Sequence, residues 1–330
     1  ASDVYKRQQQ DLADLGVNAI ELLPVTAIPG DFNWGYNPWF YFAVDDTYGS
    51  PEDFAELVET AHGLGMAVIL DMVFNHVGGG SSLDRLESLG TAGTWINHGQ
   101  EDVFGMRQLN WFSQDMRQFF LDAALFWIEQ YGIDGFRMDL VDSRDLAGYK
   151  WWRDEIKARH PNFFLIGEDF GYPPDNSVVA AGFDTQWGGQ HTDPWGGPAN
   201  NFSNLMLAIL KESPYDGRAW GGVGSFETED NPMWGLANLL SPTPGYPSWT
   251  NGVKYIMSHD ERRVVDVVDR DGTDGAKAIG GIQKAKLGAA TMFTAAGIPM
   301  LYMGDEIGED DYTPQDPAPN LVDWFSGDAG

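Results

Sequence analysis

The chain has 330 residues, of which 43% are hydrophobic and 13% aromatic, so it can bury a large core and does not have the composition of a disordered protein. Its 20 Lys and Arg against 49 Asp and Glu give a formal net charge of -29, which argues against a nucleic acid or an anionic membrane as partner and favours a neutral substrate. The absence of cysteine excludes disulfides, thiolate catalysis and cysteine zinc sites. Neither an oligomeric state nor a cellular compartment is indicated.

Strand and helix patterns alternate along the chain. Apolar, β-rich runs predict strands at residues 17–25, 67–74, 133–138, 163–166, 253–257 and 300–302, and a weaker one at 182–187. Helical periodicity predicts helices before the first strand and over residues 51–64, 113–132, 145–159, 204–211 and 275–296. Strand, helix and strand in this rhythm predict a parallel sheet.

The fold class that we expect is α/β, a (β/α)8 barrel of the TIM type. Polar residues end several different strands, which favours a barrel over an open doubly wound sheet with one switch point. The first strand and the last helix of a full ring are not found, so we expect residues 1–330 to form a truncated catalytic barrel without flanking N- and C-terminal β domains. An inserted loop region spans about 77–110, and residues 1–8 are either a non-native scar or a frayed helix.

Two segments bear on membranes and export. A long uncharged and mainly apolar run, residues 287–304, is interrupted by Gly297 and Pro299, which predicts a helix end followed by a strand, not a membrane span. The amino end, ASDVYKRQQQ, lacks the apolar core of a secretory signal.

Four strings combine an apolar run with carboxylates, histidine or arginine. They are DMVFNH (71–76), DGFRMD (134–139), LIGED (165–169) and MSHDE (257–261). A single Asp at a strand end is more often a cap, and a lone His is more often structural. Four strings in series reverse this preference, because the carboxyl ends of parallel barrel strands meet at one edge. The sequence therefore predicts a reaction site there.

Asp139 and Glu168 end successive predicted strands, so their side chains can flank one bond, since neighbouring strands lie about 4.8 Å apart. Cleavage of a glycosidic bond with retention needs two carboxyl groups about 5 Å apart. Arg137 lies two residues before Asp139 and points to the same side, which would keep Asp139 ionised. For Glu168, a proton donor, we expect a pKa raised by burial and a neighbouring carboxylate.

Other polar and aromatic residues suit a sugar substrate. Asp260 could hold sugar hydroxyls as the ring flattens, and His76 and His259 could donate to the same hydroxyls. Seven tryptophans lie in the longer polar connections, where their flat faces could stack on sugar rings: Trp34, Trp39, Trp95, Trp187, Trp195, Trp220 and Trp249.

At these residues the chain resembles the α-amylase superfamily of retaining α-glucoside hydrolases and transglycosylases, with all four signature regions in order. The resemblance implies an α-glucan polysaccharide or oligosaccharide as substrate. It makes Asp139 the nucleophile, Glu168 the general acid/base and Asp260 the carboxylate that stabilises the transition state. It implies orienting roles for Asp71 and Arg137, hydroxyl contacts for His76 and His259, and stacking under the sugar for Tyr36 of NWGYNP.

Within the superfamily, MSHDE, GEDFGYP and WGYNPWFYFAVDDTYG resemble glycogen and starch branching enzymes, which cut an α-1,4 link and rejoin the chain as an α-1,6 branch. We therefore predict a 1,4-α-glucan branching activity, with a cytoplasmic location in that case. DMVFNH is closer to amylases and debranching enzymes, and GFDTQW resembles trehalose-releasing relatives. An amylase-type or trehalose-releasing hydrolase is the alternative.

No organic cofactor is implied, because acid/base hydrolysis needs none. The resemblance does not favour calcium, since LVDS follows Asp139 where calcium-binding amylases have a Lys-His pair; Asn75 is nevertheless an oxygen donor of the kind calcium binds. Two other classes stay open: a catalytically inactive carbohydrate-binding scaffold, and a metal-dependent hydrolase with His76, Asp139, Glu168 and His259 as ligands. The charge of Arg137 in such a cluster argues against a metal.

Overall fold

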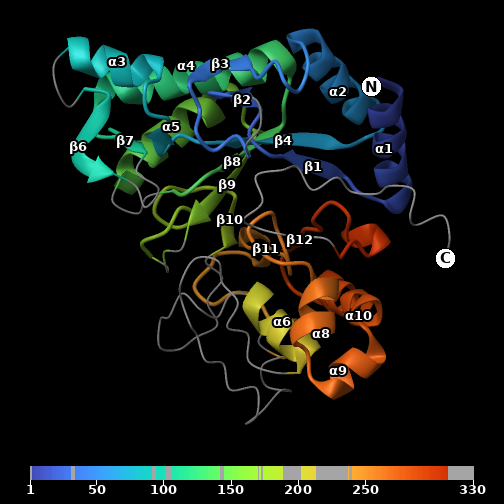
Figure 1. Ribbon diagram of the computed structural model, residues 1–330. Helices are drawn as coiled ribbons and strands as arrows, with labels where there is room; N and C mark the ends of the chain where they lie inside the picture. The colour runs from blue at the N-terminus through green and yellow to red at the C-terminus, as the bar shows by residue number, and fades with distance from the viewer. Residues whose placement is uncertain are drawn as a thin grey trace. The chain divides into compact units, whose positions relative to one another are not determined.

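The computed structural model describes residues 2–30, 34–90, 94–101, 106–141, 145–169, 171, 174–188, 202–212, 237 and 240–310. The chain forms two compact units, in both of which strands and helices alternate (Figure 1). The first unit contains residues 1–169 and 175–184, and the second contains residues 170–174 and 185–330. None of the described helices is long and apolar enough to cross a membrane.

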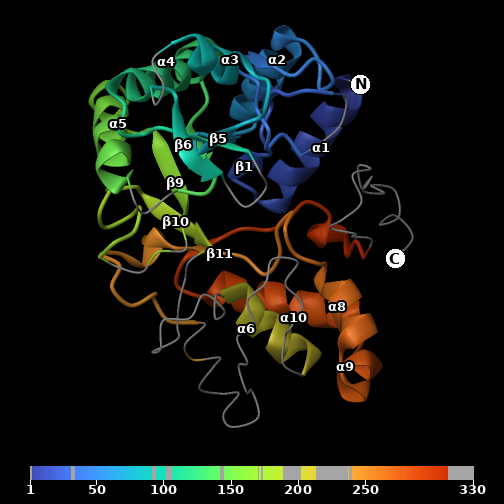
Figure 2. The same ribbon diagram turned by 60° about the vertical axis from the view of Figure 1, so that its left-hand side comes forward.

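The first unit is built on parallel strands in the order β1 (Ala19–Leu22), β4 (Ala67–Met72), β8 (Gly135–Met138) and β9 (Phe164–Asp169). Helix α1 (Ser2–Leu15) precedes β1, and α2 (Pro51–Gly63), α4 (Gln114–Tyr131) and α5 (Leu146–Arg159) connect successive strands. These helices form an outer layer around the strands in both views (Figures 1 and 2). The predicted parallel arrangement of these four strands is confirmed.

The helices begin and end where the sequence provides caps. Ser50 accepts the backbone N–H of Asp53 and the Asp53 carboxylate accepts the N–H of Ser50, a capping box that starts α2. At the start of α4 the Ser113 side chain accepts the backbone N–H of Met116, and Gly132 ends the helix at a φ of 71°, a left-handed conformation that glycine adopts without strain.

The core of this unit lies between the sheet and its helices. Trp127 of α4, Trp152 of α5 and Phe136 of β8 are fully buried, and each contacts other aromatic rings. Burial of large aromatic side chains supplies much of the free energy that holds helices against a sheet, about 1.5–3 kcal/mol for a residue such as Phe. The carboxyl ends of β4, β8 and β9 are thus anchored to a rigid scaffold.

Two small antiparallel sheets lie in the connections of the first unit. One pairs β2 (Thr26–Ala27) with β3 (Phe40–Val44), and the other has the order β5 (His76–Val77), β7 (Arg107–Leu109), β6 (Ile96–Glu101). Helix α3 (Ser82–Leu89) lies between β5 and β6. The connection at about 77–110, expected as a loop region, therefore contains regular structure.

The second unit repeats the alternation. Strand β11 (Val253–Lys254) pairs in parallel with β12 (Ile298–Pro299), and Gln186 of β10 (Thr185–Gly188) forms a parallel bridge to Gly252. Helix α6 (Phe202–Lys211) packs with α8 (Val264–Asp271) and α10 (Gly281–Thr294) around an apolar core. The short helices α9 (Asp274–Ile279), η2 (Trp249–Asn251) and η3 (Asp305–Ile307) complete the described elements.

Three differences from the sequence expectation occur here. The helix expected over 275–296 is two helices, because Gly280 adopts a φ of 93° and separates α9 from α10. The last strand is Ile298–Pro299 and not 300–302, since Lys254, the last residue of β11, pairs with Pro299. Helix α8, which the sequence did not predict, buries four valines, three of them in the apolar core that it shares with α6 and α10. Tertiary packing overrides their preference for strands.

Candidate active site

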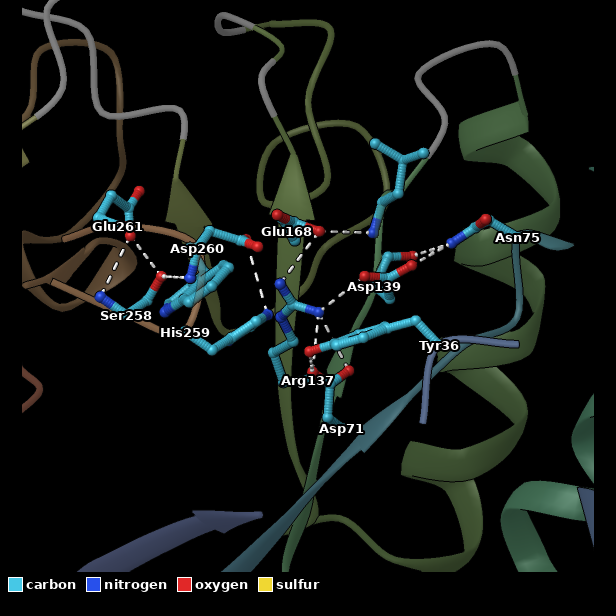
Figure 3. A network of polar contacts seen from close by, with 12 residues as sticks. Tyr36, Asp71, Asn75, Arg137, Asp139, Glu168, Ser258, His259, Asp260 and Glu261 are labelled. Atoms are coloured by element: carbon cyan, nitrogen blue, oxygen red, sulfur yellow. Dashed lines mark hydrogen bonds and ion pairs between the residues drawn. The ribbon is translucent and has the colours of Figure 1, made fainter. Parts of the chain in front are cut away.

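The register of the sheet brings the predicted site residues of the first unit together. Asp71 on β4 lies directly opposite Arg137 on β8, and Met138 on β8 lies opposite Gly167 on β9. The residues that follow, Asp139 and Glu168, therefore stand level at the carboxyl ends of two adjacent strands. Figure 3 shows their side chains around the guanidinium of Arg137.

Arg137 is the centre of this network. Its Nη1 lies 2.9 Å from Asp71 Oδ2 and 3.0 Å from Asp139 Oδ1, and its Nη2 lies 3.1 Å from Glu168 Oε2. Only 1% of the residue is exposed. Burial alone would lower the pKa of Arg137, but the surrounding carboxylates, Asp71 first, raise it well above its usual value. One permanently charged group thus holds three carboxyl groups in fixed positions.

Asn75 is a site residue whose role was not predicted. Its Nδ2 donates to Asp139 Oδ2 at 2.7 Å and to the Asp139 carbonyl at the same distance. Together with the bond from Arg137, each carboxylate oxygen of Asp139 accepts a hydrogen bond. A signal was present in the string DMVFNH, but it suggested Asn75 as a calcium ligand and not as the neighbour of Asp139.

Tyr36 and Asp71 form a second layer below the carboxylates. Tyr36 donates its hydroxyl to Asp71 Oδ2 at 2.6 Å, and the Arg137 guanidinium lies 6.0 Å from the centre of the Tyr36 ring. Burial raises the pKa of Asp71 to about 8, against the opposing effect of Arg137. Burial also raises the pKa of Tyr36 well above its usual value, so its hydroxyl keeps its proton and acts as a donor.

Glu21 on β1 is a further carboxyl group that the sequence reasoning missed. Burial raises its pKa, Arg137 opposes this, and the charge of Glu21 raises the pKa of Asp71. The available signal was a charged residue inside the apolar strand sequence AIEL. Four carboxyl groups therefore interact electrostatically with one arginine.

Glu168 is held by a backbone group in an unusual conformation. Leu140, the residue after Asp139, has a φ of 42°, in the left-handed region that side chains other than glycine rarely adopt. Its backbone N–H donates to Glu168 Oε2 at 2.9 Å, and the N–H of Val141 donates to the Glu168 carbonyl at 2.7 Å. The turn after β8 thus fixes both the side chain and the backbone of Glu168.

His76 lies beside this network but is 2% exposed. Its Nε2 lies 2.6 Å from the Tyr36 carbonyl, and its own carbonyl accepts the hydroxyl of Tyr41 at 2.8 Å. It therefore fixes the backbone of Tyr36 in this structure. A contact between His76 and a sugar hydroxyl stays a prediction.

His259 and Asp260 belong to the second unit. His259 stacks on Trp187 with a ring separation of 5.9 Å and an angle of 13°, and Trp187 in turn stacks on Tyr255 at 5.0 Å. His259 Nε2 lies 3.6 Å from Asp260 Oδ2, the carboxylate oxygen of its neighbour (Figure 3). The aromatic stack sets the plane of the His259 ring.

The tryptophans considered as sugar platforms differ in burial. Trp187 is 2% exposed and forms part of this internal stack, so the expectation that it offers a free face is wrong for it. Trp249 is 57% exposed, and Trp34, Trp39 and Trp95 are half-buried. Trp195 and Trp220 lie outside the described residues.

The donor set of the network does not suit a metal ion. Asp71, Asp139 and Glu168 all face the Arg137 guanidinium, which supplies the positive charge between them. Asn75 turns its amide nitrogen toward Asp139, and a nitrogen that donates cannot bind a cation. Within the described ranges, no group of three or more His, Asp or Glu could hold a metal ion.

Comparison with known proteins relates the chain to the alpha-amylase family of catalytic domains. Residues 7–86 match the family model of the alpha amylase catalytic domain. Over 91% of its length, the chain is 28% identical to the malto-oligosyltrehalose trehalohydrolase of Saccharolobus solfataricus, and over 94% it is 26% identical to the pullulanase of Bacillus subtilis. It covers 53% and 46% of these proteins, so the chain spans about half the length of the curated relatives that it matches.

Solved structures show the same fold. The α-amylase of Anoxybacillus superposes with a TM-score of 0.70 at 22% identity, covering 94% of this chain and 65% of that one. With the parallel strands and connecting helices described above, this likeness confirms the predicted (β/α)-barrel fold class. The predicted closeness to branching enzymes is not shown by these relatives, which are a trehalohydrolase and a pullulanase.

Proposed function

We propose that this protein is a retaining glycoside hydrolase that acts on α-glucans. The observation that supports the proposal best is the placement of Asp139 and Glu168 at level positions on adjacent strands, on either side of one guanidinium. Two carboxyl groups on adjacent strand ends suit the short separation of a retaining enzyme, about 5–5.5 Å, better than the 6.5–9.5 Å of an inverting one.

Asp139 is the proposed nucleophile. Its two oxygens accept hydrogen bonds from Arg137 and Asn75, which hold the carboxylate in one orientation. An oxygen of Asp139 forms a bond to the anomeric carbon as the bond to the leaving oxygen breaks. The product of this step is a covalent glycosyl ester, and the charge of Arg137 stays in place throughout.

Glu168 is the proposed general acid and base. It gives its proton to the leaving oxygen in the first step, and its carboxylate takes a proton from water in the second. The water oxygen then displaces Asp139 from the anomeric carbon and restores the starting configuration. The N–H groups of Leu140 and Val141 hold Glu168 at the same position for both steps.

The remaining predicted residues receive supporting roles in this proposal. Asp260 stabilises positive charge on the flattened sugar ring, and His259, held flat by Trp187, contacts sugar hydroxyls. Tyr36 stacks beneath the sugar while its hydroxyl is held by Asp71. No metal or organic cofactor takes part, because the acid, the base and the nucleophile are all side chains.

Within α-glucan chemistry we propose hydrolysis, including release of trehalose from an oligosaccharide end, over branching. The support comes from the relatives, whose names are a malto-oligosyltrehalose trehalohydrolase and a pullulanase, and from the string GFDTQW at residues 182–187. Incubation of the 330-residue chain with maltooligosyltrehalose, amylose and pullulan distinguishes these activities by product. Free trehalose supports the proposed subgroup, and new α-1,6 links in amylose contradict it.

The stereochemical course tests the reaction itself. The first product anomer, followed by proton NMR, should be α, and a β product would show inversion and overturn the mechanism. A slow 5-fluoro-α-glucosyl fluoride should label Asp139, as identified by mass spectrometry of peptides. Asp139→Asn should lower turnover by on the order of 10³-fold or more with unchanged circular dichroism; substantial remaining activity would disprove the assignment.

A further inference from the structure

The turn that carries Asp260 is closed by its own polar groups. The backbone N–H and hydroxyl of Ser258 both donate to Glu261 Oε2, and the N–H of Asp260 donates to Ser258 Oγ at 3.1 Å. These bonds fix the shape of the turn. All of them lie within the turn, so they do not attach it to the rest of the second unit.

Arg263, two residues after this turn, makes that connection. It is 2% exposed, and its Nη1 donates to Asp305 Oδ1 at 2.8 Å. Its guanidinium lies 4.4 Å from the centre of the Tyr302 ring, and Asp305 Oδ2 accepts the backbone N–H of Tyr302 at 3.2 Å. The segment after β11 and the segment after β12 are therefore joined by one buried pair.

The chain makes room for this guanidinium. Gly304 has a φ of 98°, and a Cβ at this position would lie 3.1 Å from Arg263 Nη2. A side chain there would strain the backbone and crowd the pair. The sequence YMGDEIG thus supplies Asp305 as the partner of Arg263, and its glycine leaves the space that the Arg263 guanidinium occupies.

Stability alone is a weak reason for such a pair, since burial of two charges usually costs about as much as their attraction returns. Resting on the proposed function, we propose that Arg263 and Asp305 are a positioning pair for the reaction, which holds the turn of Asp260 in the geometry that stabilises the transition state. Neither residue touches the substrate in this proposal. Both act through the placement of Asp260.

Electrostatics link the pair to Asp260. Burial raises the pKa of Asp305 to about 6, with Arg263 opposing and Glu306 adding to the rise. Burial, and after it the charges of Asp305 and Asp260, raise the pKa of Tyr302, so Asp260 lies within electrostatic reach of the ring on which Arg263 rests. When Asp305 takes up a proton, Arg263 loses its charged partner and the turn loses its fixed contact.

Protonation of Asp305 should lower activity without unfolding the protein. Its pKa is higher in the folded state than the usual 3.8, so between these values the folded state binds more protons than the unfolded one. This carboxyl group by itself therefore makes the folded state more stable as pH falls from about 6. Loss of activity in that range, with the fold intact, is the expected signature.

The test uses α-maltosyl fluoride, a substrate whose leaving group needs no proton, so that kcat/KM reports the nucleophile and the stabilisation of the transition state. Asp305→Asn should lower kcat about 10-fold with KM changed less than two-fold. The kcat of the wild type should fall as pH decreases through about 6, and the kcat of Asp305→Asn should show no such fall. Arg263→Lys, which keeps the charge, should recover part of the activity lost in Arg263→Gln.

The double variant Arg263→Gln/Asp305→Asn should be no slower than either single variant, because the two residues act as one unit. Asp271→Asn is the matched control, since Asp271 is an exposed partner of Arg262, the residue just before Arg263, and it should leave kcat unchanged. Unchanged kcat and pH profile in Asp305→Asn, even with a lower melting temperature, would overturn the inference. A wild-type chain that cleaves no α-glucan and no α-maltosyl fluoride would instead overturn the proposed function and, with it, this inference.

Discussion

The backbone N–H of Leu140 donates to Glu168 Oε2 at 2.9 Å from a residue whose φ is 42°. A branched side chain in the left-handed region costs about 1–2 kcal/mol, so the surrounding structure must impose this conformation. The N–H of Leu140 reaches the carboxyl group of Glu168 from this turn, while Asp139, one residue earlier, is held by Arg137. Strain at one residue thus serves the alignment of the two carboxyl groups.

Leu140→Gly should be more stable than Leu140→Ala by about 1 kcal/mol. Both variants remove the leucine side chain, but only glycine adopts a positive φ without a clash of the Cβ. Denaturant unfolding measures the difference in unfolding free energy. The dependence of that free energy on denaturant concentration must be the same for both variants. An alanine variant as stable as the glycine variant would show that the turn carries no strain.

An amide-to-ester substitution at Leu140 replaces its N–H with an oxygen, and it also makes the Asp139 carbonyl, which accepts from Asn75 Nδ2, a weaker acceptor. We expect kcat/KM on maltohexaose, which needs a proton on its leaving oxygen, to fall about 10-fold, in keeping with a lost hydrogen bond to a charged group of about 1.5 kcal/mol. On α-maltosyl fluoride, kcat/KM should stay within two-fold, because fluoride leaves without the acid.

The matched control is the same ester at Val141, whose N–H donates to the Glu168 carbonyl and not to its carboxyl group. That variant should be less stable than the wild type. Its kcat/KM should change by a similar factor on maltohexaose and on α-maltosyl fluoride. Equal losses on both substrates for the Leu140 ester would mean that its N–H supports the fold and does not position Glu168.

The stability of the protein should depend on the proton of Asp71. Its pKa in the folded state is about 8, well above the usual 3.8, so between these values the folded state binds more protons than the unfolded one. The free energy of unfolding should therefore fall as pH rises toward 8, with a slope of up to about 1.4 kcal/mol per pH unit from one proton. Above that pH the contribution is lost.

Asp71→Asn removes this titration. The difference in unfolding free energy between the wild type and the variant, measured by urea at several pH values from 5 to about 8.5, should shrink as pH rises. A difference that is constant over this range would contradict the protonation of Asp71. In this variant the acceptor of the Tyr36 hydroxyl changes from a carboxyl oxygen to an amide oxygen, so tyrosine absorbance offers a second readout.

The candidate site could be predicted largely because its residues end strands. Arg137 lies in β8 and Asp139 directly follows that strand, two residues further on, so the alternation of side chains sends both to the same side of the sheet. The pairing of Asp139 with Glu168 then needs only that successive strands be neighbours, which the parallel sheet confirms. Short-range periodicity was enough for this part.

The contacts that tune these residues depend on information that periodicity lacks. The positive φ of Leu140 cannot be read from a leucine, because nothing in its residue type favours that conformation. The amide of Asn75 reaches Asp139 across 64 positions of the sequence. The burial of Trp187 was missed for the same reason, since a tryptophan in a connection rich in polar residues gives no sign of the rings that will cover it.

Arg137→Met should be among the most damaging substitutions in the first unit. The three carboxyl groups now held by one guanidinium would share a buried space without a positive charge. Loss of one partner from a buried ion pair costs about 3–5 kcal/mol, because the remaining charge is left without compensation. Some of this cost will be relieved by uptake of protons, so the variant should be more stable at pH 5 than at pH 8, relative to the wild type.

Arg159→Met provides the control, because Arg159 pairs with Glu155 on the exposed face of α5 and such pairs contribute only about 0.3–0.5 kcal/mol. Arg137→Lys separates charge from shape. Lysine keeps the positive charge but cannot bridge Asp139 and Glu168 with two nitrogens, so we expect most of the stability to return while kcat stays at least 10-fold low. Full activity in Arg137→Lys would show that charge alone matters, and that the planar fork does not set the spacing of the two carboxyl groups.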